Sequence, residues 1–457
     1  MAKKKTGIWR IIDDFEGDKF IWMIVLLLIM LSILTISSST SLLALQTGST
    51  RSAIINKQIF IAVIGLGIII ACYNFLNNIK FLKFVAQTGF AISLFLLLCL
   101  AVRIRTPLIR AEEINGAVRT LRIFGLPFQL HVFEFVKLFM VLYLAWACQT
   151  FKDHGFALAN RLGENPHFAF LKKKRIQVLV YIILPVIIIT VLILMGSASS
   201  ALFIGAIMIV TVLLGGAVSL KESLPIVLAG ILLLGGCVGL SFATNGKVFP
   251  RIHTAASRLT MAGENMEEKL AKAADKTDFQ DVLDKVKQPI SAKVAVSEGG
   301  FFGKGPGRST QRYVVPVMFE DYMFSFIVEE YGILGALLVI ILYGTLLARG
   351  SIIAKNCTTL FSKTVVAGLI ITISGQAMMH MLINVDLGPL TGQTLPMLSH
   401  GASSFLAFSI SFGIILSISR MVKKKVEKDV AQMKPILEVR DDVRESLDDL
   451  DQLDALD

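Results

Sequence analysis

The chain has 457 residues, of which 54% are hydrophobic and only 17% are charged, and its mean hydropathy is +0.70. No soluble domain needs so much apolar surface, so the composition excludes a soluble globular protein and favours an all-α polytopic membrane protein. The formal net charge of +11 does not indicate nucleic-acid binding, because the basic clusters stand beside apolar runs, as the positive-inside rule expects.

The N-terminus is basic but lacks a small-residue cleavage site, and the apolar run after it is too long for a signal peptide. We therefore expect a retained first helix, and the apolar runs predict ten spans. They cover residues 20–45, 58–76, 82–102, 130–150, 176–195, 199–217, 224–242, 322–347, 364–385 and 396–419. The chain then divides into an N-terminal segment 1–19, a ten-helix membrane domain 20–419 and a tail 420–457.

Basic residues gather before the first span and in the connections after spans four, eight and ten. With ten helices all four segments fall on one side, which the positive-inside rule identifies as the cytoplasm. Both termini are then predicted to be cytoplasmic. The tail is basic at first, and residues 438–457 hold nine acidic residues interleaved with leucines. We expect a solvated, disordered segment there, with a partner-binding helix as the alternative.

Two loops fall on the opposite side. Residues 103–128 carry five arginines against two glutamates, which opposes the positive-inside trend. A diphosphate would compensate this charge, because arginine forms bidentate contacts with phosphate oxygens. Lipid head groups or acidic side chains of the other loop are the alternative partners. That other loop, residues 243–320, is long enough to suggest a function, and residues 264–289 within it are predicted to form an amphipathic surface helix.

The second loop ends in a glycine-rich basic segment, which runs directly into Glu320, Asp321 and an apolar helix. Glycines at 299, 300, 303, 305 and 307 allow backbone N–H groups to converge on an anion, although a flexible turn without ligand is the alternative. Asp321 is expected at the water–lipid boundary, where a carboxylate can accept a proton from a lipid-linked substrate. A carboxylate at a helix start can also be only a cap.

Three features together resemble the SEDS family (shape, elongation, division, sporulation), the bacterial peptidoglycan glycosyltransferases RodA, FtsW and SpoVE. They are the run GGFFGKGPGRSTQRYVVP followed by DYMFSFIVEEYGILG, the later TGQTLPMLSHGASS, and the ten-span topology. The resemblance covers residues 12 to 420, approximately. The GDKFIW before the first span and the GPG-S-x-Q-R form of the loop look more like the cell-division member, FtsW, than RodA.

The resemblance implies that the chain joins lipid II units on the outer face of the cytoplasmic membrane and releases undecaprenyl diphosphate. The family's essential aspartate opens the helix after the long loop, and Asp321 matches it. Its implied role is to deprotonate or orient the acceptor's sugar hydroxyl. A divalent cation, Mg²⁺ or Mn²⁺, could share the task of offsetting charge, and Asp321 could bind it instead. The implied partners are a class B penicillin-binding protein transpeptidase and other divisome or elongasome membrane proteins.

Other positions match the family pattern and are candidate substrate-binding residues. Glu134 and Lys137 match P-S-E-x-x-K and can pair across one helix turn, with a structural ion pair as the alternative role. Arg119 matches the arginine of G-A-x-R. The remaining basic candidates could steer or bind diphosphate, or be ordinary surface charges: Arg251, Arg258, Lys304, Arg308 and Arg312.

Ser403 belongs to the T-G-x-x-L-P-x-x-S-x-G-x-S-S match, whose small and hydroxylated residues are expected to line the central cavity. The chain departs from the family pattern at Thr120, Ser197 and His380. Glu320 replaces a polar residue usual in the family, and a second negative charge beside Asp321 is expected to raise the carboxyl pKa values. Adjacency alone gives Glu320 no role.

His400 occupies an adaptable position of the family, and we expect a histidine with satisfied hydrogen bonds there. Two functions other than polymerisation are compatible with the same features. One is a flippase or transporter of the lipid-linked precursor, since many helices and an arginine-lined cavity would serve it. The other is a scaffold that recruits division proteins without chemistry.

Overall fold

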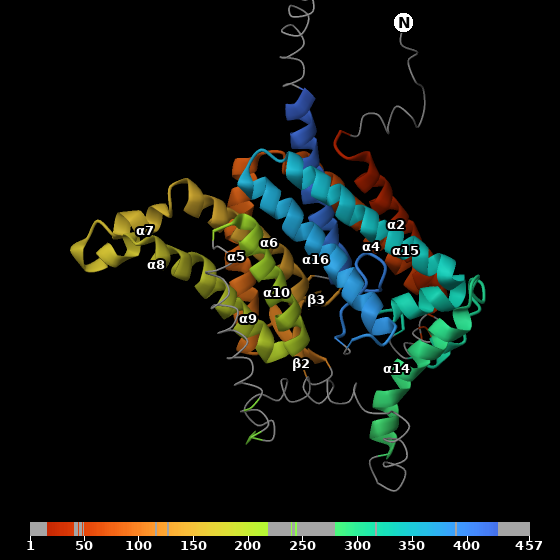
Figure 1. Ribbon diagram of the computed structural model, residues 1–457. Helices are drawn as coiled ribbons and strands as arrows, with labels where there is room; N and C mark the ends of the chain where they lie inside the picture. The colour runs from red at the N-terminus through yellow and green to blue at the C-terminus, as the bar shows by residue number, and fades with distance from the viewer. Residues whose placement is uncertain are drawn as a thin grey trace, which may run out of the picture.

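The computed structural model describes residues 16–40, 50–114, 117–125, 128–217, 279–315, 318–388 and 391–427, with the single positions 44, 48, 239, 243 and 244. Within these ranges nine helices are long and apolar enough to cross a membrane. They confirm the predicted all-α polytopic fold (Figure 1). The nine are α2 (Lys19–Ser39), α4 (Arg51–Phe75), α5 (Ile79–Ala101), α6 (Val132–Asp153), the α8–α9 span (Lys174–Gly196), α10 (Ala198–Gly215), α15 (Met323–Asn356), α16 (Leu360–Asn384) and a last helix, Ala402–Glu427.

Each of these helices corresponds to a predicted span, and the predicted seventh span, 224–242, lies outside the described residues. Several predicted bounds differ from the structure by six residues or more, and two of them concern the site. The last span was predicted from residue 396, but residues 396–401 form turns before the helix begins at Ala402. The second span was predicted from residue 58, but α4 begins at Arg51, so its first turns carry the charged Arg51 and Lys57.

Polar residues cap the apolar helices. The side chain of Asp18 accepts hydrogen bonds from the N–H groups of Phe20 and Ile21, at 2.9 and 3.2 Å. Thr50, Asn78 and Thr359 do the same at the starts of α4, α5 and α16. Each cap satisfies N–H groups that have no partner inside the helix, which fixes where an otherwise uniform apolar run begins.

The bundle has a buried centre and a lipid-facing periphery. In α6 and in the last helix 72% of the most apolar stretch is buried, against 22% in the α8–α9 span. The central helices approach closely, because Gly368 of α16 faces Val141 of α6 and Thr211 of α10. The α8–α9 span lies at the edge, joined to α6 by an arm of α7 (Ala157–Leu162) and the 3-10 helix η1 (Pro166–Lys172) (Figure 1).

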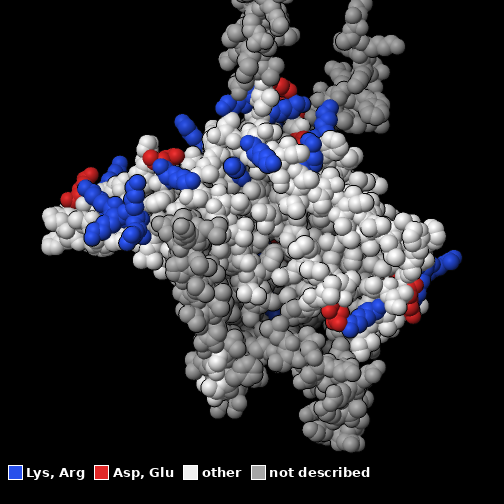
Figure 2. All heavy atoms as spheres, viewed as in Figure 1, with Lys and Arg blue, Asp and Glu red and all other residues white. Residues whose placement is uncertain are grey.

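Both described ends of the chain meet at one end of the bundle. Glu16 accepts hydrogen bonds from Arg420 at 2.6 Å and pairs with Lys424 at 2.9 Å, and Asp18 pairs with Arg349 at 2.5 Å. On the face shown in Figure 2, lysine and arginine gather at this end and on the α7–α8 arm, and a broad belt without charged side chains separates them from a second charged region. We call the first end the terminal end and the other the distal end.

The distal end carries a small sheet that the sequence analysis did not predict. β1 (Ile109–Ile114), β2 (Ala117–Ile123) and β3 (Leu130–His131) form an antiparallel sheet in the order β1-β2-β3. The predicted outer arginine loop is therefore largely a hairpin. β3 leads directly into α6, so the sheet is anchored at the start of one of the two most buried helices among the described spans.

The same end carries α14 (Phe279–Gly299), which packs against α15. The predicted surface helix 264–289 overlaps it only in part. Residues 264–278 lie outside the described residues, whereas α14 continues past Pro289 as far as Gly299. The glycine-rich segment follows directly, and with the 3-10 helix η3 (Gln311–Tyr313) it leads the chain back to the start of α15.

Candidate active site

Asp321 lies half-buried at the distal end, just before α15. The N-cap of α15 is Tyr322, which makes no side-chain capping hydrogen bond, so Asp321 lies one residue before the N-cap position. Gly392, with φ of +63°, turns the segment after α16 against the Asp321 carboxylate. A Cβ at position 392 would lie 3.8 Å from Oδ2 of Asp321, an ordinary van der Waals distance, so this turn passes close to the carboxylate.

Two side chains of α16 hold the start of α15. Asn384 donates from Nδ2 to the carbonyl of Asp321 at 3.1 Å, and its Oδ1 accepts from the N–H and hydroxyl of Ser325 at 2.9 and 3.0 Å. His380 accepts from the N–H of Phe324 at Nε2, at 3.4 Å, and its Nδ1 lies 2.7 Å from the carbonyl of Gln393. These bonds replace a conventional cap and fix the backbone that carries Asp321.

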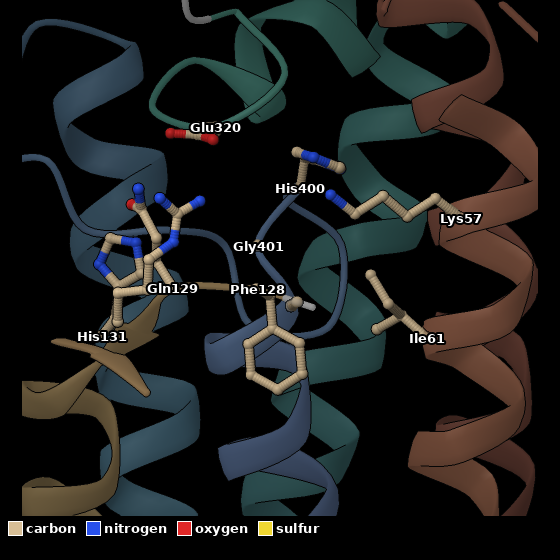
Figure 3. Close-up of a pocket in the computed structure, with 10 residues that line it drawn as sticks. Lys57, Ile61, Phe128, Gln129, His131, Glu320, His400 and Gly401 are labelled. Atoms are coloured by element: carbon tan, nitrogen blue, oxygen red, sulfur yellow. The ribbon is translucent and has the colours of Figure 1, made fainter. Parts of the chain in front are cut away.

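A cavity of about 430 Å³ opens beside this backbone. Its polar lining comes from six separate elements or connections and consists of Lys57, Arg122, Gln129, His131, Glu320 and His400. Figure 3 shows the Glu320 carboxylate above the cavity, with His400 and Lys57 on one side and Gln129 and His131 on the other. Asp321 is the next residue in the chain, but it does not line this cavity.

Two hydrogen bonds lock the segments that bear Glu320 and His400 to each other. The hydroxyl of Ser399 donates to the carbonyl of Glu320, and the N–H of His400 donates to the carbonyl of Phe319, both at 2.8 Å. The His400 ring stands edge-on to Phe319, with centroids 5.7 Å apart. The two titratable side chains therefore reach the same cavity from connections that are bonded together.

Burial and neighbouring charge move both groups toward neutrality. Burial, reinforced by the negative charge of Asp321, raises the pKa of Glu320 to about 7. Burial and the nearby Lys57 lower the pKa of His400 to about 4, so this imidazole is neutral at physiological pH. Its Nδ1 has no hydrogen-bond partner among the described residues, which corrects the prediction of a satisfied histidine.

The predicted pair Glu134–Lys137 forms in α6, with Nζ 2.8 Å from Oε1. Lys137 also donates to Oε1 of Gln376 at 2.5 Å, and Ser404 donates to Glu134 at 3.2 Å. The network thus ties α6 to α16 and to the last helix, and the nearly complete burial of Lys137 requires such partners. This geometry fits the structural role considered for the pair, and neither residue lines the cavity.

Ser403 supports the cavity wall from behind. Its hydroxyl donates to the carbonyl of Gln129 at 2.5 Å and accepts from the N–H of His131 at 3.1 Å. It is buried and does not line the cavity, so it positions two residues that do. Arg119 lies half-buried on β2. For both residues, substrate binding stays a prediction.

The glycine-rich segment is bound to a kink in α15. Gly332 has φ of +66° and ψ of −162°, which only glycine adopts readily, and this interrupts the helix. The carbonyls of Glu329 and Glu330 then accept from the N–H groups of Lys304 and Gly305, both at 2.9 Å. The segment therefore completes the hydrogen bonding of the broken helix.

The anion at this segment is supplied by the chain itself. Oε1 of Glu330 accepts from Ser38 at 2.6 Å and from the N–H of Gly307 at 2.9 Å. Glu329 accepts from the hydroxyl of Ser309 at 2.5 Å and from the N–H of Thr310 at 2.8 Å. Both carboxylates are fully buried. Of the glycines expected to hold an anion, Gly307 donates to one of them, whereas the N–H groups of Gly303 and Gly305 donate to backbone carbonyls.

The basic candidates of the long loop differ in their contacts with these two carboxylates. Lys304 pairs with Glu329 at 2.7 Å and with Glu298, and hydrogen bonds to both carboxylates raise its pKa despite burial. Arg312 is buried, 3.9 Å from Glu330, whereas Arg308 is exposed. None of these three lines the cavity. Arg251 and Arg258 lie outside the described residues, and all five assignments stay predictions.

The arginines of the hairpin gather beside the cavity. Arg122 pairs with Glu112 at 3.3 Å, and Gln129 donates to Glu112 at 2.5 Å. Gln129 also lines a second cavity of about 350 Å³ together with Arg105 and Arg110. Part of the positive charge is thus balanced inside the hairpin, and part faces the two cavities.

In the parts of the chain that the structure describes, no three His, Cys, Asp or Glu side chains lie close enough together to hold a metal ion. The carboxyls of Glu320 and Asp321 alone do not make a protein ligand set. Mg²⁺ or Mn²⁺ therefore stays a prediction.

The sequence analysis missed Lys57, Gln129 and His131 as cavity residues. Lys57 was placed just outside a span, but it lies inside α4, and a charged residue within an apolar helix is a functional candidate by default. A span drawn seven residues longer would have found it. Gln129 and His131 carry no such signal, because only the sheet and Ser403 bring them to the site.

Known proteins share this architecture. Residues 18–424 match the family model described as "Cell cycle protein", FTSW_RODA_SPOVE. "Stage V sporulation protein E" of Bacillus subtilis is 36% identical over 143 residues, which is 31% of this chain and 39% of that protein. "Probable peptidoglycan glycosyltransferase FtsW" of Enterococcus hirae is 27% identical over 92% of this chain and 97% of that protein. The alignments with the first four relatives cover less than two fifths of their lengths.

Two solved structures have the same fold. One is a chain from a structure described as "Structural coordination of polymerization and crosslinking by a peptidoglycan synthase complex". It matches with a TM-score of 0.59 at 22% identity, over 88% of this chain and 98% of that one. The rod shape determining protein RodA of Thermus thermophilus matches with a TM-score of 0.50 at 20% identity, over 88% and 97%. Since the family model covers most of its length, the chain belongs to the FtsW, RodA and SpoVE family of cell cycle proteins.

Proposed function

We propose that the chain is a peptidoglycan glycosyltransferase that polymerises lipid II, with Asp321 as a catalytic carboxylate. The observation that carries the proposal is the distal cavity. There two adjacent carboxyl groups, one lining the cavity and one beside it, meet the cations Lys57 and Arg122. Relatives that bear the name peptidoglycan glycosyltransferase support the reaction class.

The geometry suits a displacement at a sugar carbon. A carboxylate takes the proton of the acceptor's hydroxyl as its oxygen attacks the anomeric carbon of the donor, and the lipid diphosphate leaves with the electron pair of the broken C–O bond. Lys57 and Arg122 offset the charge that grows on the diphosphate, in a cavity where burial strengthens electrostatic interactions. Because a diphosphate is already a good leaving group, no second acid is required.

The proposed setting is the bacterial cytoplasmic membrane. Both described ends of the chain lie at the terminal end with most of the basic connections, which by the positive-inside rule supports a cytoplasmic terminal end and a cavity on the outer side. A class B penicillin-binding protein transpeptidase is the proposed partner, together with other divisome or elongasome proteins. The FtsW-like sequence features favour a role in division.

Replacement of Asp321 by Asn tests the function. We expect the purified wild type, supplied with its transpeptidase and labelled lipid II, to form glycan polymer, and Asp321→Asn to form at least about 100-fold less. The matched control is Asp386→Asn, since Asp386 is an exposed carboxylate at the same end whose partner is the exposed Lys293. It should polymerise as the wild type does.

The same variants separate the other two functions. Lipid flipping that survives in Asp321→Asn, with no polymer from any variant, would replace the proposal by a transporter. Cells that tolerate Asp321→Asn, with neither polymer nor flipping in vitro, would indicate a scaffold.

A further inference from the structure

The cavity presents a carboxyl group that the resemblance to the family does not assign. Glu320 lines the cavity, whereas Asp321 lies against the backbone at Gly392 and does not. We infer that Glu320 is a second catalytic residue of this chain and the group that accepts the proton of the attacking hydroxyl. The inference rests on the proposed glycosyl transfer.

The surroundings of Glu320 direct its side chain to the substrate space. Its backbone is held by Ser399 at 2.8 Å, and among the described residues its carboxylate forms no salt bridge that a substrate would need to displace. The charged and titratable groups that share its cavity are Lys57 from α4, Arg122 from β2, His131 from β3 and His400 from the connection before the last helix. Figure 3 shows the Glu320 carboxylate above the cavity, so a ligand inside the cavity would lie below this carboxylate in that view.

The two neighbouring carboxyl groups then have different roles in the reaction. Asp321, next to Glu320 in the chain, contributes the negative charge that raises the proton affinity of Glu320. During the attack the hydroxyl proton passes to a carboxylate oxygen of Glu320, the new C–O bond forms at the anomeric carbon, and the diphosphate departs. Glu320 returns the proton to solvent before the next cycle. A base whose pKa lies near the working pH is the most effective kind, and burial places Glu320 there.

The test compares Glu320→Gln with the wild type in lipid II polymerisation across pH. We expect kcat to fall by at least about 100-fold with KM little changed, because Gln fills the same volume but cannot take a proton. In the wild type the rate should rise with pH toward about 7, as Glu320 loses its proton, and the residual rate of Glu320→Gln should lack this limb. The matched control, Glu164→Gln, alters an exposed acid between α7 and η1 and should change neither quantity.

Chemical rescue distinguishes proton transfer from a structural role. Glu320→Ala leaves space at the cavity rim, so added formate should restore part of its activity, while Glu320→Gln should not respond. Wild-type kcat and an unchanged pH profile in Glu320→Gln would overturn the inference but leave the proposed function intact. Failure of formate to rescue a folded Glu320→Ala would also count against it. A wild type that forms no polymer at any pH would overturn both.

Discussion

Asn384 is the residue whose contacts bear most directly on Asp321. Its side-chain amide donates to the Asp321 carbonyl and accepts from the N–H and the hydroxyl of Ser325. All three hydrogen bonds lie at the start of α15. Because the side chain itself is buried, water cannot replace it without rearrangement. Asn384 therefore acts on the reaction through the position of Asp321.

Asn384→Ala is expected to lower stability by about 1–3 kcal/mol, since it leaves buried backbone groups without partners. Its polymerisation rate should fall further than that loss of folded protein explains, because the carboxylate is no longer held. Thermal unfolding in detergent and initial rates of lipid II polymerisation measure the two effects. Asn78→Ala, which removes the cap of α5 far from the cavity, is the matched control.

The control should lose stability without a specific loss of rate. Equal loss of rate in the two variants, once corrected for folded protein, would show that Asn384 has no positioning role.

At the scale of single residues, the sequence predicts what local spacing determines. Glu134 and Lys137 are three residues apart on a helix, and their pairing follows from that spacing. The cavity follows from no such rule. Lys57, Gln129 and Glu320 meet only because separate helices and the sheet converge at the distal end. Family resemblance identified Asp321, but only the packing shows that its neighbour faces the cavity.

At the scale of elements, the long apolar runs predict their helices because each run must satisfy its backbone in lipid. The hairpin was missed although Asn115–Gly116, between two alternating runs, is a strong hairpin signal in the sequence. The kink of α15 was missed for a different reason. It depends on the glycine-rich segment, whose Lys304 and Gly305 N–H groups donate to the carbonyls of Glu329 and Glu330.

Gly332→Ala is expected to disrupt this kink. The backbone conformation of Gly332 alone costs a non-glycine residue about 1–3 kcal/mol, and a Cβ there would collide with the Phe301 carbonyl and the backbone of Gly303. We expect a lower unfolding temperature and faster tryptic cleavage after Lys304 or Arg308, as the glycine-rich segment separates from α15.

Gly344 of the same helix provides the control. A Cβ there meets nothing within 4 Å, so Gly344→Ala should leave stability unchanged or raise it by about 0.5–1 kcal/mol. If Gly332→Ala has the unfolding temperature and the tryptic cleavage rate of the wild type, the kink does not depend on glycine.

At the scale of the whole molecule, hydropathy and charge predict the topology of the nine described spans, and the structure brings both described chain ends to one end. What they do not predict is how the ends are fastened. Glu16 bridges Arg420 and Lys424, and Asp18 bridges Arg349, so the start of the chain holds the last helix and α15 together. Such contacts join residues that lie hundreds of positions apart, so no local sequence pattern predicts them.

The fastening at Glu16 should depend on pH in a defined direction. Hydrogen bonds from Lys424 and Arg420 lower the pKa of Glu16 below its ordinary value of about 4.3. In acid the unfolded chain therefore binds this proton more readily than the folded chain, so the contribution is complete above about pH 4.3 and is lost as the pH falls through the lower, folded value. Exposed pairs of this kind contribute about 0.2–1 kcal/mol.

Thermal unfolding of the wild type and Glu16→Gln, measured from about pH 6 to about pH 3, tests this linkage. The wild type should be the more stable of the two near pH 6, and the difference should shrink as the pH falls and as salt screens the pair. Glu427→Gln is the control, because Glu427 faces Lys423 within a single helix at 3.8 Å and fastens nothing to the chain's start. A wild-type advantage that is constant across this range would mean that Glu16 stabilises the bundle by packing, and that its charge is not what holds the last helix to the start of the chain.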